Sequence, residues 1–136
     1  MLDKIFSSVN TLQNGLNASW LRNEVISDNI ANVDTPGFKA SHVRFEDLMA
    51  EAVGLGEGSL EMAVTDTNHI PTSGGGRIDS VEPEIVRDDT TTTRMDGNNV
   101  NIDNEMVELA KNSINYYTTV SKVNSEFRKL NTAING

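Results

Sequence analysis

The sequence predicts a mainly α protein whose long N- and C-terminal helices pair as an antiparallel coiled coil, with a small irregular or β-containing middle lobe between them. Three observations support this prediction. Apolar residues recur at alternating spacings of four and three along the C-terminal third of the chain. A similar register runs through the first 33 residues. All three prolines and eight of the ten glycines fall between Pro36 and Gly97, so the middle of the chain has a different composition.

The C-terminal third predicts one long helix over residues 101–136. Its heptad register is kept throughout, and neither Pro nor Gly interrupts it before Gly136. At about 1.5 Å per residue the helix is roughly 50 Å long, and Asn101 or Asp103 can cap its start. A rod of this length needs another helix to bury its apolar stripe. Apart from Ser113, the positions of this predicted assembly seam are Ile102, Met106, Leu109, Tyr116, Val120, Val123, Phe127, Leu130 and Ile134.

The N-terminal segment supplies that partner, because it predicts a second helix from about Asp3 to Asn32. Gly15 weakens this helix by about 1 kcal/mol relative to Ala, and Ser19 and Asn23 interrupt its apolar stripe. Two stripes of similar length at opposite ends of a chain are most simply explained as an antiparallel pair. The N-terminal part of the assembly seam consists of Leu2, Ile5, Val9, Leu12, Leu16, Ile26, Ile30 and Val33.

This interpretation divides the chain into three parts. Residues 1–35 and 101–136 form the two helices of one helical core domain, and residues 36–100 form the middle lobe, which we expect to be partly flexible. The apolar area of the seam barely offsets the entropy of ordering two such helices, so the isolated pair is expected to be marginally stable.

A second apolar stripe runs along the C-terminal helix beside the first. One neighbouring helix cannot cover both stripes, so either the middle lobe or another copy of the chain packs there. An ordinary helical hairpin core would account for the first stripe alone. The second stripe consists of Val107, Ala110, Ile114 and Tyr117.

The middle lobe contains several local signals. Thr35 to Phe38 suits a type II turn, because Pro36 fixes φ at its second position and Gly37 accepts a positive φ at its third. Residues 45–53 have helical spacing, and a tight turn at 96–99 leads into the last helix. Two short stretches with loose alternation, 60–64 and 78–86, are candidate strands.

Composition and motifs argue against several functions. The net charge of −9 disfavours binding to nucleic acid or to anionic lipid, and cysteine is absent. The two histidines, His42 and His69, lack metal-ligand spacing, and the glycines at 54, 56 and 58 lack the Lys-Ser/Thr of a phosphate loop. No catalytic residue, cofactor site or metal site is predicted, so we expect the chain not to be an enzyme. Residues 1–14 do not have the pattern of a cleaved secretory signal, and no apolar run is long enough to span a membrane.

The run from Asn29 to Lys39 closely resembles the N-terminal signature of the bacterial flagellar rod and hook family. That family also has heptad-bearing helices at both termini, so the resemblance covers the whole chain. Within it, the short length and the stretches 68–71 and 96–103 are most similar to a subunit of the proximal rod, with the other short rod protein as the nearest alternative. The residues that carry the signature turn are Asn29, Asn32, Asp34, Thr35, Pro36, Gly37 and Phe38.

The resemblance implies a structural subunit of the flagellar basal-body rod, the drive shaft, with its terminal helices lining an inner tube. It also implies export through the flagellar type III apparatus without a cleaved signal, to the periplasmic side of the cell envelope. The implied partners are copies of the chain, other rod proteins, and the export gate at the base of the rod. From the residues alone, a soluble coiled-coil adaptor or chaperone remains an alternative, as does an enzyme seated in the acidic middle lobe.

Overall fold

The computed structural model describes residues 2–53, 81–92 and 94–135. Within these residues the order of helices and strands is α1 (Leu2–Ala31), β1 (Ser41–Arg44), α2 (Glu46–Val53), β2 (Glu84–Arg87) and α3 (Ile102–Asn135). Side chains of α1 are described from Val9 onward. No helix in the described ranges combines the length and the apolar character that a membrane crossing requires.

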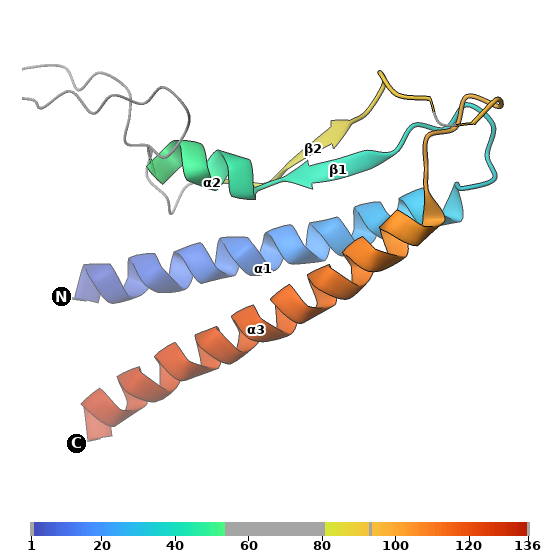
Figure 1. Ribbon diagram of the computed structural model, residues 1–136. Helices are drawn as coiled ribbons and strands as arrows, with labels where there is room; N and C mark the ends of the chain where they lie inside the picture. Colours follow the sequence, from blue (N-terminus) through green and yellow to red (C-terminus); the bar gives the residue numbers. More distant parts are fainter. Residues whose placement is uncertain (1, 54–80, 93, 136) are drawn as a thin grey trace, which may run out of the picture.

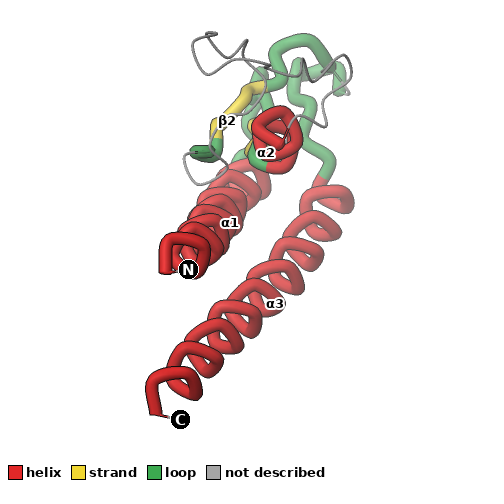
Figure 2. Tube along the Cα trace, turned by 90° about the vertical axis from the view of Figure 1, so that its left-hand side faces the viewer, coloured by secondary structure: helices red, strands yellow, loops and turns green. Residues whose placement is uncertain are grey.

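The two long helices run in opposite directions and pack together, as the sequence predicts (Figure 1). They lie closest near the end of α1 and the start of α3, and they diverge towards the two termini of the chain (Figures 1 and 2). Small residues permit the close approach of the two helices. A Cβ atom at Gly15 would lie 4.0 Å from Thr119 Cγ2, and Ser19 is buried at the same face.

The apolar core lies on the other side of α1, between this helix and the middle lobe. Figure 1 shows α1 between α3 on one side and α2 with the two strands on the other. The buried residues of this core are Ala18 and Val25 of α1, Val43 of β1, and Phe45 just before α2. Leu21, Met49 and Val81 pack against them and are partly buried.

The described part of the middle lobe contains a two-stranded antiparallel sheet. Strand β1 pairs with β2, with Ser41 opposite Arg87 and Arg44 opposite Glu84. The predicted helix at 45–53 is confirmed as α2. Strand β1 is missing from the sequence-based prediction, and β2 begins at Glu84, near the end of the predicted 78–86 strand. The predicted strand at 60–64 lies outside the described residues.

The ends of the helices follow the predicted chemistry. Asn101 is the cap of α3, because its Oδ1 accepts hydrogen bonds from the N–H groups of Asp103 at 3.0 Å and Asn104 at 3.3 Å. Beyond α1, Phe38 N donates to Thr35 O at 3.2 Å across a turn in which Gly37 has φ of +72°. This agrees with the predicted type II turn.

Candidate functional site

The end of α1 is tied to the start of β1 by one buried side chain, Asn29. Its Nδ2 donates to Ser41 O at 2.8 Å, and its Oδ1 accepts from Ser41 N at 3.0 Å. The same Nδ2 also donates to Glu105 Oε2 in the first turn of α3, at 3.2 Å. A side-chain amide that bonds both the N–H and the C=O of one residue supplies the same two hydrogen bonds that a neighbouring strand would supply. Asn29 therefore determines where β1 begins and connects α1, β1 and α3.

Asn98 has a similar role in the loop that leads into α3. Its side chain is fully buried, and Nδ2 shares its two N–H groups among the carbonyl oxygens of Asn32, Val33 and Thr35, at 2.9–3.0 Å. Its Oδ1 accepts from Val100 N at 2.7 Å. One amide thus satisfies the carbonyls of the turn that follows α1, where the helix no longer supplies partners.

Two glycines lie against each other where these turns meet. Gly37 and Gly97 have φ of +72° and +83°, a region that favours glycine. Gly37 N donates to Asp96 O at 2.9 Å, and a Cβ on Gly97 would lie 3.6 Å from Gly37 Cα. We call the assembly of residues 29–39 with residues 94–99 the signature junction.

Charged side chains form ion pairs and a hydrogen bond on the outer side of the signature junction. Arg94 donates from Nη1 to Val33 O at 3.0 Å and forms ion pairs with Asp34 at 3.7 Å and Asp96 at 3.5 Å. These groups are mostly exposed, so the pairs contribute about 0–1 kcal/mol each and serve mainly to orient the loop.

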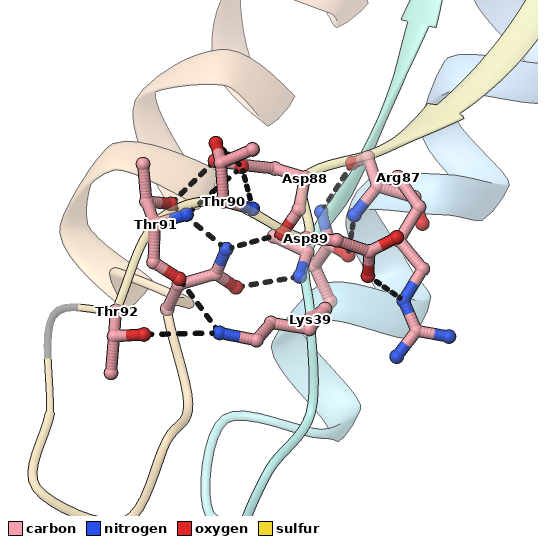
Figure 3. A network of polar contacts seen from close by, with 11 residues as sticks. Lys39, Arg87, Asp88, Asp89, Thr90, Thr91 and Thr92 are labelled. Atoms are coloured by element: carbon pink, nitrogen blue, oxygen red, sulfur yellow. Dashed lines mark hydrogen bonds and ion pairs between the residues drawn. The ribbon is translucent and has the colours of Figure 1, made fainter.

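Polar contacts continue from the junction into residues 88–92, the segment that follows β2 (Figure 3). Asn99 Oδ1 accepts from Ala40 N at 2.7 Å, while its Nδ2 donates to Asp88 O at 2.9 Å. Lys39 extends alongside and donates from Nζ to Thr91 O at 2.7 Å. The last residues of the signature are therefore fixed to the β2 side of the lobe.

Asp88 organises the bend after β2. Its carboxylate accepts hydrogen bonds from the hydroxyl and N–H groups of Thr91 and Thr90 (Figure 3). These hydrogen bonds, that of the Thr91 hydroxyl first, lower the pKa of Asp88 to about 2. Thr90 and Thr91 are therefore folded into a local hydrogen-bonded bend around the Asp88 carboxylate.

An ion pair links α1 to α2 on the core side of the lobe. Arg22 donates from Nη2 to Glu46 Oε2 at 2.5 Å, and the Arg22 side chain is 17% exposed. Burial alone would raise the pKa of Glu46, but the hydrogen bond and the charge of Arg22 outweigh it and keep that pKa below its usual value. The pair holds the start of α2 against α1.

The residues of the predicted assembly seam are distributed unevenly between burial and exposure. On α1, Ile26 is buried, and Val9, Leu12, Leu16 and Ile30 are half-buried, as is Val33 in the turn after this helix. The side chains of Leu2 and Ile5 lie outside the described set. On α3, Leu109, Val120, Val123 and Leu130 are half-buried, and Ile102, Met106, Tyr116, Phe127 and Ile134 are exposed.

The second stripe is exposed along its whole length. Val107 is 53% exposed, Ile114 is 66% and Tyr117 is 71%, and Ala110 is exposed as well. Among the 34 residues of α3, Asn112 is the one buried residue. The described part of the middle lobe packs on the far side of α1 and does not cover this stripe (Figure 1).

Two grooves border the place where α1 and α3 meet. The larger, of about 420 Å³, lies between α1, β1 and α3 and is lined by charged and polar groups that include Arg22, Glu105 and Lys111. The smaller, of about 230 Å³, lies between Trp20 on α1 and Tyr116 and Tyr117 on α3.

Sequence reasoning missed several residues that position these elements. Asn98 is predicted only as part of a tight turn, and Asn112 belongs to neither apolar stripe of its helix. Both are asparagines in otherwise polar surroundings, and periodicity gives no sign that they are buried. The spacing of Ala18, Leu21 and Val25 at three and four residues could have revealed the face of α1 that packs on the lobe.

The fold and the signature junction define a structural protein, in which long, largely uncovered terminal helices are fixed to a small lobe by side-chain amides. In the described parts of the chain, no group of three or more His, Cys, Asp or Glu residues could hold a metal ion. Comparison with known proteins shows to which family of structural proteins the chain is similar. A family model described as "Flagella basal body rod protein" matches residues 9–39, which include most of α1 and the whole signature turn.

Relatives match over nearly the whole chain. The flagellar basal body rod protein FlgB of Bacillus subtilis is 37% identical over 129 residues, covering 95% of this chain and 94% of that protein. Proteins of the same name from Proteus mirabilis and Borreliella burgdorferi are 32% and 33% identical over 96% and 84% of this chain, and the alignments cover 95% and 85% of those proteins. The chain belongs to the family of flagellar basal body rod proteins, and it is a structural subunit of the basal-body rod.

Proposed function

We propose that this chain is a FlgB-like subunit of the proximal rod and that it assembles through its two terminal helices. The near full-length similarity to proteins named FlgB supports this choice over the alternative, a subunit like the other short rod protein, FlgC. In this proposal the assembly seam and the second stripe are the contact surfaces, and copies of the chain and other rod proteins are the partners.

The exposure of α3 is the observation that carries the proposal. A helix of 34 residues with one buried residue and several exposed large apolar side chains is poorly stabilised by its own chain. Burying apolar surface contributes roughly 25 cal/mol per Å², so covering these side chains with neighbouring subunits would supply stability that the single chain lacks.

The signature junction supplies a second requirement of a rod subunit. A shaft that transmits torque needs a fixed angle between its helices and its lobe. The buried side chains of Asn29 and Asn98 connect α1, β1 and the loop before α3 through partly buried hydrogen bonds, and such contacts resist shear better than exposed ion pairs. We propose that residues 29–39 maintain this angle, and that residues 1–35, 36–100 and 101–136 act as helix, lobe and helix.

We infer the route of export, and contact with the export gate at the base of the rod, from the family resemblance and from the composition of the first residues. The chain would leave through the flagellar type III apparatus without a cleaved signal and meet the export gate at the base of the rod. It would reside on the periplasmic side of the envelope, without direct contact to lipid or nucleic acid.

A concentration series in sedimentation, with two variants of equal charge change, tests the assembly proposal. Ile114→Asp places a carboxylate in the exposed second stripe, and Asn104→Asp places one on the same helix at an exposed polar site outside both stripes. We expect the wild type and Asn104→Asp to grow in size with concentration and Ile114→Asp to stay small. A discrete oligomer of constant size in the wild type would favour the adaptor or chaperone instead.

A further inference from the structure

The smaller groove between α1 and α3 has the character of a protein contact site. Trp20 is 65% exposed, Tyr117 is 71% exposed, and the rings of Tyr116 and Tyr117 meet edge to face with centroids 5.9 Å apart. We call this groove, with its lining residues Ser19, Trp20, Asn23, Asn112, Ser113, Tyr116 and Tyr117, the aromatic groove. Exposed Trp and Tyr are enriched at protein interfaces, where their apolar rings are covered and their polar ends stay hydrated.

Asn112 lies on α3 where this helix contacts α1, and it gives an independent indication that the groove lacks a binding partner. Its side chain is 4% exposed, and Nδ2 donates to Ser19 O at 2.8 Å. Its Oδ1 is buried and has no donor among the described residues. Buried side-chain acceptors in folded proteins are paired in the large majority of cases, so a further donor is needed here.

The two halves of α3 carry opposite charge. Residues 102–117 contain three acidic residues and one basic residue, for a net charge of −2. Residues 118–135 contain three basic residues and one acidic residue, for a net charge of +2. The aromatic groove lies on the acidic half, so the basic half of another α3 is complementary to it in charge.

The basic half of α3 also offers apolar side chains that fit an aromatic groove. Phe127 is 53% exposed and Ile134 is 80% exposed, seven residues apart, so both lie on one side of the helix. This end of α3 diverges from α1, as both views of the fold show (Figures 1 and 2). It is therefore accessible to a second molecule.

We propose that the aromatic groove of one copy receives the basic half of α3, residues 118–135, from a second copy of this chain. The inference rests on the proposed rod function and specifies which surfaces of two subunits meet. Because the groove and the helix end are different surfaces, the contact is heterologous, and each copy keeps one groove and one helix end free for the next. Such contacts generate rings or open helical arrays, the geometry that a rod needs.

Cross-linking of two single-cysteine variants tests the proposal, since the natural chain contains no cysteine. Ser113→Cys places a thiol in the aromatic groove, and Asn131→Cys places one on the basic half of α3. The two full-length variants are mixed at a concentration at which the chain sediments as an assembly, and a short bismaleimide is added. We expect the mixed dimer to form about tenfold more than with the control pair Ser113→Cys and Asp89→Cys, in which the second thiol lies on the lobe.

A third variant tests the role of the aromatic rings. Adding Tyr117→Ser to Ser113→Cys removes one exposed ring and should lower the yield of mixed dimer with Asn131→Cys towards that of the control pair. Circular dichroism of the double variant confirms that the helices persist.

The outcomes separate this inference from the function on which it rests. An assembly that forms without the mixed cross-link, or that links only two Ser113→Cys copies to each other, would overturn the inference and leave the rod function standing. A chain that stays monomeric at every concentration would overturn both.

Discussion

Asn29 holds Ser41 by both of its backbone groups, donating to the carbonyl oxygen at 2.8 Å and accepting from the N–H at 3.0 Å. Asn29 is 1% exposed, so a polar side chain occupies an interior position of α1 where an apolar residue would be expected. The geometry explains why: the backbone N–H and C=O of Ser41, the first residue of β1, pair with a side chain of α1 instead of with a neighbouring strand.

Replacing Asn29 with Ala should lower the free energy of unfolding by about 2 kcal/mol, because the partly buried backbone groups of Ser41 lose their partners. Urea denaturation followed by circular dichroism measures the change. Asn124→Ala, at an exposed site on α3, should change the value by less than about 0.5 kcal/mol. Equal effects of the two substitutions would contradict the role assigned to Asn29.

Substituting Gly37 and Gly15 with Ala should change the stability of the fold in opposite directions. Gly37 has φ of +72°, and a Cβ at this position would meet no other atom within 4 Å, so Gly37→Ala introduces backbone strain alone and should cost about 1 kcal/mol. Gly37→Asn should cost less, since Asn tolerates this conformation better. Gly15→Ala lies inside α1 at ordinary contact distance from Thr119 and should instead stabilise the helix by up to about 1 kcal/mol. Thermal melts of the three variants provide the comparison.

The Asp88 carboxyl should titrate well below its ordinary pKa of 3.8, at about 2. Because the pKa in the folded chain is lower than in the unfolded chain, the ionised carboxylate favours folding at pH above about 4, and this contribution is lost as the pH falls from about 4 to 2. NMR titration of the carboxyl carbon measures the pKa. Thr91→Val should raise the pKa, since the Thr91 hydroxyl contributes the strongest hydrogen bond, and Asp88→Asn should remove this part of the pH dependence. A wild-type value near 3.8 would show that the bend is not formed in solution.

The spacing of apolar residues predicted the long helices because it repeats over many helical turns. Both terminal helices and α2 lie where the apolar spacing predicts them, and Gly37 has the positive φ that its turn requires. The four residues of β1 give too short a pattern to be recognised. The position of β1 depends on Asn29, at a separation of 12 residues, and on β2 across the intervening chain.

The candidate site was predictable in part. The resemblance of residues 29–39 to the family signature identified one half of the signature junction, but the mutual contact of Gly37 and Gly97 depends on tertiary packing that no local pattern encodes. The apolar stripes of α1 and α3 predicted that the helices pair. They did not predict that the buried core of the single chain lies between α1 and the lobe, because the apolar spacing on that face of α1, at Ala18, Leu21 and Val25, is shorter than the seam and is less apparent beside it.

Substitutions in the predicted seam should separate assembly from export. Leu109 and Val120 are half-buried positions of α3, and a carboxylate at either one would have to be desolvated at a subunit contact. Leu109→Asp and Val120→Asp should each abolish rod assembly while the chain is still exported. Immunoblots of culture medium report export, and electron microscopy of isolated basal bodies reports assembly. Normal rods in either variant would argue against the seam.

In a dilute monomer, the distal part of α3 should exchange its amide hydrogens faster than the segment of α1 that packs on the lobe. Asn112 is the one buried residue of α3, whereas α1 contributes Ala18 and Val25 to the core, so opening residues 120–135 exposes little additional apolar surface. Hydrogen exchange measured by mass spectrometry should show weak protection there and stronger protection around residues 18–29. Raising the concentration until the chain assembles should then protect 120–135 as well, because neighbouring copies cover it. Strong protection of this segment in the monomer would mean that the helix is stabilised within one chain, and the physical reason for assembly through it would be lost.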